Sequence, residues 1–102
     1  MIMAKYRLTP QAESDLFRIY EYGVLNFGAN DADDYYWALF ERFDHIAEQP
    51  KLYPAVDHIR EGYRRSVYKA DSIYYRIADD GIVEIITILG RQNEIGVFEE
   101  LF

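Results

Sequence analysis

The hydrophobic pattern in the first half of the chain predicts a short strand followed by a helix. Polar and apolar residues alternate from Lys5 to Leu8, as they do in a half-buried strand. Thr9 can cap a helix, and Pro10 suits the first helical position because its missing N–H would have no partner there. Apolar residues then recur at spacings of three and four until about Asn26. This period predicts a helix with one buried stripe.

A second helix is predicted directly after the first. Gly28 suits the left-handed conformation that closes a helix, and either Asn30 or Asp31 can cap the next one. This helix should run to about Glu48, because Pro50 prevents its continuation. Its apolar stripe consists of Ala32, Tyr36, Leu39, Phe40, Phe43, Ile46 and Ala47. With so few residues between them, the helices should form an antiparallel hairpin.

The second half of the chain has the pattern of β-structure. Residues 51–62 show no sustained period, which indicates a long surface connection. Three segments rich in Tyr, Val and Ile follow, at Tyr63 to Tyr68, Ser72 to Ala78 and Ile82 to Leu89. The last is apolar on nearly both faces, which predicts a central strand. The expected fold is α+β with the order βααβββ, in which the helical hairpin packs on one face of a small, mostly antiparallel sheet.

Composition limits the classes to which this protein can belong. The 102 residues are half apolar and include ten Tyr, six Phe and one Trp, which favours one compact domain over residues 1–102. The absence of cysteine excludes disulfides, cysteine zinc sites and thiol nucleophiles. The longest apolar runs are too short to cross a bilayer, so we expect a cytoplasmic protein that does not bind membranes.

Charge is strongly segregated along the chain. The formal net charge is −7, yet the segment from His58 to Arg76 has five bases against two acids. Nine acids face two bases between Gln11 and Pro50. Such an acidic total argues against stable direct nucleic-acid binding across the whole surface, but it leaves room for a local basic site.

Little in the sequence indicates a catalytic or metal centre. His45 lies between apolar residues of the second helix, where partial burial explains it, and His58 has no set of further ligands at a workable spacing. The serines lack a nucleophile motif, and the glycines do not form a phosphate-binding loop. We therefore expect no catalytic residues, no metal and no other cofactor.

Arg64 and Arg65 form the most informative pair of charged residues. Because they are adjacent on a strand, their side chains must point to opposite faces. One interpretation is that the inward arginine pairs with acids of the helices or of the C-terminus. The other is that both contribute, with Arg76 and Arg91, to a surface that binds an acidic partner or a phosphate backbone.

Several motifs, in order, resemble the ParE-type toxins of the RelE/ParE superfamily of bacterial toxin–antitoxin systems. The run from Leu8 to Tyr22 resembles the opening pattern LTPxAxxDLxxIxxY of that family. The later segments that agree in order are Pro50, Tyr53 and Pro54; Ile59, Gly62, Tyr63, Arg64 and Arg65; Ile73, Tyr75 and Arg76; and Val83 to Leu89 followed by Gly90, Arg91 and Gln92. The resemblance covers nearly the whole chain and implies the same βααβββ fold.

The resemblance also implies a function and two partners. A ParE-type toxin stops growth by binding and poisoning DNA gyrase, and a ParD-like antitoxin neutralises it. We expect the antitoxin to lie across the hairpin and the sheet edge and to contact Leu16, Tyr20, Tyr36, Phe40, Arg64 and Arg65. For the target we name Arg76, Arg91, Phe98 and Phe102.

Two other functions remain open at this point. RelE-like relatives cleave messenger RNA on the ribosome with a reactive Tyr or His and basic residues, but the chain after Arg91 contains no Lys, Arg, Tyr or His. This favours a toxin that acts by binding and is not an enzyme. The third possibility is a non-toxic interaction module that adds a strand to a partner. The apolar C-terminal residues would either fold back onto the sheet or contact another chain.

Overall fold

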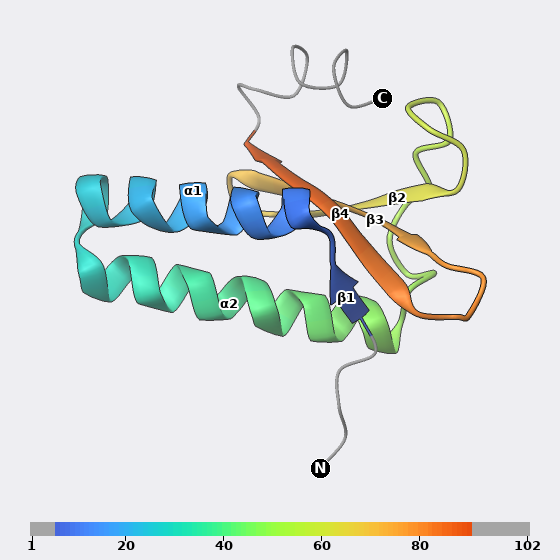
Figure 1. The fold of residues 1–102 in the computed structure, drawn as a ribbon, viewed down its shortest axis with the longest axis horizontal. Coiled ribbons are helices and arrows are strands. Elements are labelled where there is room, and N and C mark those ends of the chain that lie inside the picture. Colours follow the sequence, from blue (N-terminus) through green and yellow to red (C-terminus); the bar gives the residue numbers. More distant parts are fainter. Residues whose placement is uncertain (1–5, 91–102) are drawn as a thin grey trace.

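The computed structural model describes residues 6–90 and has the predicted α+β architecture (Figure 1). The elements, in chain order, are β1 (Tyr6–Leu8), α1 (Pro10–Phe27), α2 (Ala29–Glu48), β2 (Tyr63–Tyr68), β3 (Asp71–Ile77) and β4 (Val83–Gly90). The two helices run side by side as an antiparallel hairpin, and one end of the hairpin projects beyond the sheet (Figure 1). Neither helix of the described part is long and apolar enough to span a membrane.

The start of α1 joins the helix to the sheet. The Thr9 hydroxyl oxygen accepts a hydrogen bond from the Ala12 N–H at 3.1 Å, which confirms the predicted cap. The same hydroxyl donates to the Ile86 carbonyl of β4 at 2.7 Å. The Thr9 side chain therefore both caps the helix and fixes the start of the helix against the sheet.

The turn between the helices is shorter than the sequence suggested. Gly28 is the single residue between α1 and α2, so the predicted cap at Asn30 or Asp31 is wrong. The Gly28 N–H donates to the Val24 carbonyl, and the Gly28 carbonyl accepts from the Ala32 N–H. Its φ of 91° lies in the region that favours glycine, which lets one residue reverse the chain.

The sheet has the strand order β1-β4-β3-β2. β1 pairs with β4 in parallel, whereas the other two pairs are antiparallel, with a register irregularity between Tyr74 and Tyr75 where β3 meets β4. The predicted central position of the last strand is confirmed, because β4 lies between β1 and β3. Its two buried faces explain the continuous apolar run.

The main core lies between the hairpin and one face of the sheet, as predicted. Its fully buried side chains include Leu39, Phe43 and Ile46 of α2 and Ile73 and Ile85 of the sheet.

A second, smaller cluster lies on the opposite face. There Val56 is buried against Tyr74 and Leu89. Residues 51–62 are therefore not only a surface connection, because Val56 fills space that the bare sheet would leave open to water.

Candidate functional site

An aromatic groove runs along the hairpin beside β1. It has a volume of about 610 Å³. We call it the aromatic groove, and it is lined by Leu8, Glu13, Leu16, Phe17, Tyr20, Asp33, Tyr36, Trp37 and Phe40. Four of the six antitoxin contacts expected from the sequence are in this set, namely Leu16, Tyr20, Tyr36 and Phe40.

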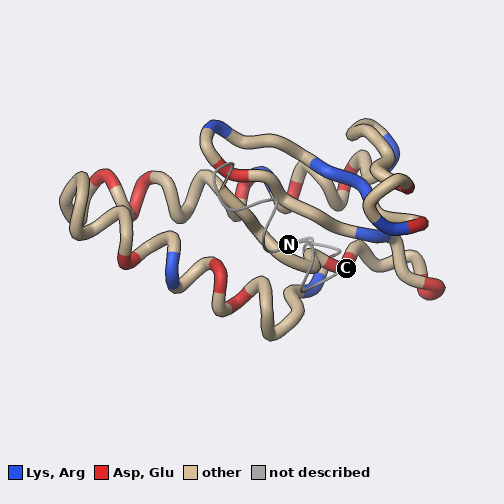
Figure 2. The backbone as a smooth tube through the Cα atoms, turned by 90° about the horizontal axis from the view of Figure 1, so that it is seen from above, with Lys and Arg blue, Asp and Glu red and all other residues tan. Residues whose placement is uncertain are grey.

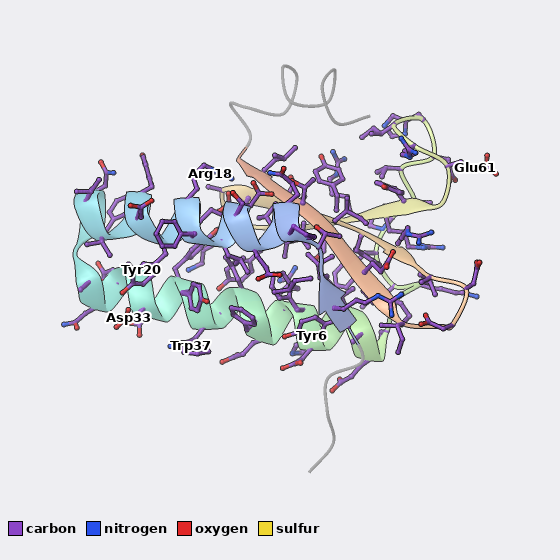
Figure 3. The ribbon with its side chains drawn as sticks, viewed as in Figure 1. Tyr6, Arg18, Tyr20, Asp33, Trp37 and Glu61 are labelled. Carbon is purple, nitrogen blue, oxygen red and sulfur yellow. The ribbon has the colours of Figure 1, made fainter. Side chains whose placement is uncertain are left out.

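Contacts between the two helices position the side chains of the groove. Tyr20 of α1 and Asp33 of α2 face each other across the hairpin, with Trp37 one turn further along α2 (Figure 3). The Tyr20 hydroxyl donates to Asp33 Oδ1 at 2.6 Å, and this hydrogen bond raises the pKa of the Tyr20 phenol. The Tyr20 and Tyr36 rings meet edge to face with centroids 5.6 Å apart. The groove is therefore formed in the isolated chain.

The antitoxin contacts predicted from the sequence do not include two exposed aromatic residues of the groove. Phe17 is 66% exposed and Trp37 is 62% exposed, although both are large and apolar. The stripe of each helix gave the residues that face the core, and these two lie outside both stripes. The sequence does contain a signal for them, because both are large apolar residues at helix positions outside the buried stripe. Groups of exposed apolar side chains often mark the place where a partner binds.

Leu16 has a different role from the one expected. It is only 3% exposed and belongs to the main core, so it can form the floor of the groove but offers almost no surface to a partner. Tyr20, Tyr36 and Phe40 are partly buried and form the walls.

Two acidic side chains contribute to the lining of the aromatic groove. Glu13 and Asp33 line it, and acidic positions are spread along both helices (Figure 2). Most basic residues of the described part lie outside the helices, and three of them, Arg64, Arg65 and Lys69, are on β2 and the turn after it. The groove thus favours a segment that combines apolar and basic side chains.

The structure does not bring Arg64 and Arg65 to the aromatic groove. They lie on β2, whereas the groove borders β1, and these strands form opposite edges of the sheet. Arg64 Nη1 donates to the Tyr53 carbonyl at 2.7 Å, and Arg65 Nη1 is 3.4 Å from the Tyr74 hydroxyl. Between residues 6 and 90 neither arginine forms an ion pair, so the interpretation that one pairs with acids of the helices is wrong. A partner among the C-terminal acids lies outside the described residues.

Of the four residues expected to contact a target, one can be placed. Arg76 Nε donates to Glu84 Oε1 at 2.6 Å, and Arg7 binds the other oxygen of the same carboxylate at 3.0 Å. Arg91, Phe98 and Phe102 lie outside the described residues. Arg76 is therefore a paired surface residue, still 44% exposed at its side chain.

Nothing in the described part of the chain resembles a metal centre. No group of three or more His, Asp or Glu side chains between residues 6 and 90 is arranged to hold an ion. Together, these features define a small α+β protein whose helical hairpin carries an exposed aromatic groove.

Comparison with known proteins gives the family. Residues 6–95 match the family described as the ParE toxin of the type II toxin–antitoxin system parDE. A curated relative, Toxin ParE1 of Caulobacter vibrioides, is 35% identical over 88 residues, which cover 85% of this chain and 88% of that protein. Toxin ParE1 of Mycobacterium tuberculosis is 26% identical over 92 residues, covering 90% and 94%. The chain belongs to the ParE family, the toxins of type II toxin–antitoxin systems, and the resemblance found in the sequence is confirmed.

A solved structure supports the fold. A chain from the chromosomal ParDE system of P. aeruginosa superposes with a TM-score of 0.72 at 18% identity. The match covers 86% of this chain and 98% of that one. At this level of identity the likeness shows a shared fold, and it agrees with the βααβββ prediction.

Proposed function

We propose that this toxin stops growth in the cytoplasm by binding and poisoning DNA gyrase, and that a ParD-like antitoxin neutralises it by covering the aromatic groove. Membership of the ParE family supports the toxic activity. The likeness to a chain of the P. aeruginosa ParDE system supports an antitoxin as partner. The toxin acts by binding and needs no catalytic residue.

The observation that carries the antitoxin proposal is the exposure of Phe17 and Trp37. Each places a large apolar side chain in water beside a preformed aromatic wall. Covering one such side chain contributes roughly 1.5 to 3 kcal/mol, and aromatic residues at the centre of an interface often dominate its affinity. A partner that fills the groove therefore gains most from these two residues.

The shape and charge of the groove indicate how the antitoxin binds. An amphipathic helix with apolar side chains at spacings of three and four would fill it, and basic residues beside that stripe would meet Glu13 and Asp33. We place a second contact of the same antitoxin at Arg64 and Arg65, where an acidic stretch would pair with the two cations. The antitoxin would then reach both edges of the sheet.

Binding of the antitoxin tests the first half of the proposal. The toxin is co-purified with the small protein encoded by the neighbouring gene, and Trp37→Glu is compared with Leu25→Glu. Leu25 is a matched control because it is 85% exposed and lies outside the aromatic groove. We expect Trp37→Glu to weaken the complex at least about thirtyfold, the effect of a hot-spot aromatic residue, and Leu25→Glu to have little effect. Equal losses would contradict the assignment of the groove.

Expression of the toxin alone tests the target. Growth arrest with cleaved, gyrase-linked DNA is the expected result, together with loss of supercoiling by purified gyrase. Arrest with messages cut on the ribosome would instead indicate a RelE-like ribonuclease. Unaffected growth, with the folded protein present in the cell, would indicate a non-toxic interaction module.

The proposed target contact at Arg76 is tested separately. Arg76→Gln should reduce gyrase inhibition, whereas Arg7→Gln, which removes the other cation bound to Glu84, should not. Equal activity of the two variants would exclude Arg76 from the target surface.

A further inference from the structure

The two helices of the hairpin each present a carboxylate and an aromatic ring to the aromatic groove, in the same arrangement. On α1, Glu13 is followed four residues later by Phe17, and on α2, Asp33 is followed four residues later by Trp37. Residues four apart in a helix are neighbours on one face. All four side chains line the groove, and all four residues are exposed. The groove therefore contains the same pair, a carboxylate beside an aromatic ring, twice.

Each of these pairs has the chemistry that holds a cationic side chain. The face of an aromatic ring attracts an ammonium or guanidinium group, and a carboxylate one turn away pairs with the same charge. Within residues 6–90, neither Glu13 nor Asp33 forms an ion pair, and no basic residue lines the groove. Asp33 Oδ1 accepts the Tyr20 hydroxyl at 2.6 Å, which orients the carboxylate without neutralising it. The groove therefore attracts cations at two places.

The antiparallel packing of the helices places the two carboxylates at opposite ends of the groove. Asp33 meets Tyr20 at one end, where their side chains face each other across the hairpin (Figure 3). Glu13 lies seven positions before Tyr20 on α1, which is about 10 Å along the helix axis. Phe17 follows Glu13 toward the Asp33 end, and Trp37 follows Asp33 toward the Glu13 end. Aromatic surface thus fills the distance between the two negative charges.

We propose that the aromatic groove binds an antitoxin helix with two basic side chains seven positions apart and apolar side chains at the third and fourth positions after the first of them. Seven residues make two helical turns and advance about 10 Å, so both basic side chains lie on one face at the spacing of the two carboxylates. The apolar side chains between them meet Phe17 and Trp37. An acidic segment is repelled at both ends. This inference rests on the proposed function, since it takes the antitoxin as the occupant of the groove, and it adds the side chains that the groove recognises.

Synthetic helices test the spacing of the two charges. Four peptides share one stapled helical scaffold and two leucines, at the third and fourth positions after the first charged residue. The first peptide carries arginines seven positions apart. In the second the arginines are five apart, which turns one of them to another face, and in the third they are eleven apart, which keeps the face but extends the distance to about 16 Å. The fourth peptide has glutamates in place of the arginines of the first.

Binding of the peptides to the full chain is measured by fluorescence anisotropy, after circular dichroism has shown equal helicity. We expect the first peptide to bind about fivefold more tightly than the second and third, because each of these can pair with only one carboxylate. The fourth should bind most weakly, since it is repelled at both ends. Equal affinities of the first and third peptides, or binding of none, would overturn the proposal.

Variants of the toxin show which carboxylates the arginines meet. Glu13→Gln and Asp33→Asn each remove one charge, and the asparagine keeps an oxygen that can accept the Tyr20 hydroxyl. Either change should weaken the first peptide about fivefold, so that it binds no better than the third. Glu21→Gln is the matched control, because Glu21 is exposed on α1 and lies outside the groove. An equal effect of Glu21→Gln would mean that the peptide senses only overall charge and would overturn the proposal. Thermal melting shows that each variant is folded, and Glu13→Gln alone decides if Asp33→Asn is not.

The antitoxin separates this inference from the function on which it rests. If Trp37→Glu abolishes antitoxin binding but the peptides show no preference for a spacing of seven, the spacing is wrong and the groove is still the antitoxin site. If the peptides prefer a spacing of seven but the antitoxin binds Trp37→Glu as tightly as the native toxin, the spacing holds and the antitoxin is not the occupant of the groove. We expect both the preference and the loss.

Discussion

Asp15 on α1 and Thr87 on β4 are joined by a hydrogen bond of 2.5 Å, in which the Thr87 hydroxyl donates to Asp15 Oδ2. The same oxygen accepts the Ile88 N–H at 3.0 Å, and Asp15 Oδ1 accepts from the Gln11 amide at 3.0 Å. Asp15 is 4% exposed and Thr87 is fully buried. The aspartate of the LTPxAxxDL pattern thus fixes α1 on the central strand, which gives a structural reason for one residue of the family motif.

Loss of this carboxylate should destabilise the fold. Asp15→Ala leaves the Thr87 hydroxyl and the Ile88 N–H buried without an acceptor, at a cost of roughly 3 kcal/mol in the free energy of unfolding. Urea denaturation measures the change. Glu13→Ala, an exposed neighbour on the same helix, should change the free energy of unfolding by less than about 0.5 kcal/mol. An Asp15→Ala protein as stable as the Glu13→Ala protein would show that the network contributes little.

The turn at Gly28 can be tested against the cap that the sequence suggested. Gly28→Ala forces a side chain into φ 91°, ψ 163°, a region almost restricted to glycine, and should cost about 2 kcal/mol. Asn30→Ala should be nearly neutral, since α2 begins before it and its side chain is exposed. Both values come from thermal or urea unfolding. If Asn30→Ala cost the roughly 1 kcal/mol typical of a lost cap, the helix would begin after Ala29.

Two tyrosines, the buried Tyr75 and the partly buried Tyr35, predict sensitivity to alkali. Burial raises the pKa of Tyr75 to about 12 despite the opposing charge of Arg64, and burial together with the bond to Asp71 raises the pKa of Tyr35 well above its usual value. The folded protein holds these protons more tightly than the unfolded chain. Stability from this source is therefore complete below about pH 10, the ordinary pKa of tyrosine, and falls as pH rises toward 12 and beyond.

Unfolding measured between pH 8 and 12 should show this loss. Tyr75→Phe should have a shallower decline than the native sequence, because one of the two groups is removed. Tyr22→Phe is the control, since Tyr22 is 58% exposed and has no hydroxyl contact in the described structure. Parallel curves for all three proteins would contradict the role of burial.

The ion pairs of Arg7 at the β1 edge predict that its removal raises the pKa values of two carboxyl groups by different amounts. Hydrogen bonds from Arg7 and then Arg76 lower the pKa of Glu84, whereas the pKa of Asp80 is lowered first by the Ile82 N–H and then by Arg7. Arg7→Gln should therefore raise the pKa of Glu84 more than that of Asp80 in an NMR titration. The pairs lie at the surface, with Arg7 and Asp80 exposed and Glu84 partly exposed, so the free energy of unfolding should change little. A larger rise in the pKa of Asp80 than in that of Glu84 would contradict the assignment of Arg7 as the main partner of Glu84.

The same two carboxyl groups also predict how the stability of the protein changes in acid. Because both carboxyl pKa values are lowered in the folded protein, their contribution to stability is present above the ordinary values near 4 and is lost as pH falls below them. Raising the salt concentration should reduce it, since exposed pairs are screened.

The sequence by itself determined the elements and their order. Spacings of three and four gave both helices, and alternation or richness in Tyr, Val and Ile gave the strands. The run from Ile82 to Leu89, apolar on nearly both faces, gave the central strand, which the structure has as β4. These features depend on residues close together in the chain, and the spacing of apolar residues within a segment shows which of its faces is buried. Thr9 and Pro10 marked the start of α1 in the same way.

Only the tertiary structure decided the surfaces. Phe17 and Trp37 come from different helices and lie outside both buried stripes, so their meeting in one groove depends on how the hairpin packs. Arg64 lies at the edge opposite the groove because strand order is set by pairing between distant segments. Val56 belongs to the core because it packs on Tyr74 and Leu89, on the face of the sheet opposite the hairpin. Local patterns fix local conformation, whereas a binding surface arises where segments far apart in the chain meet.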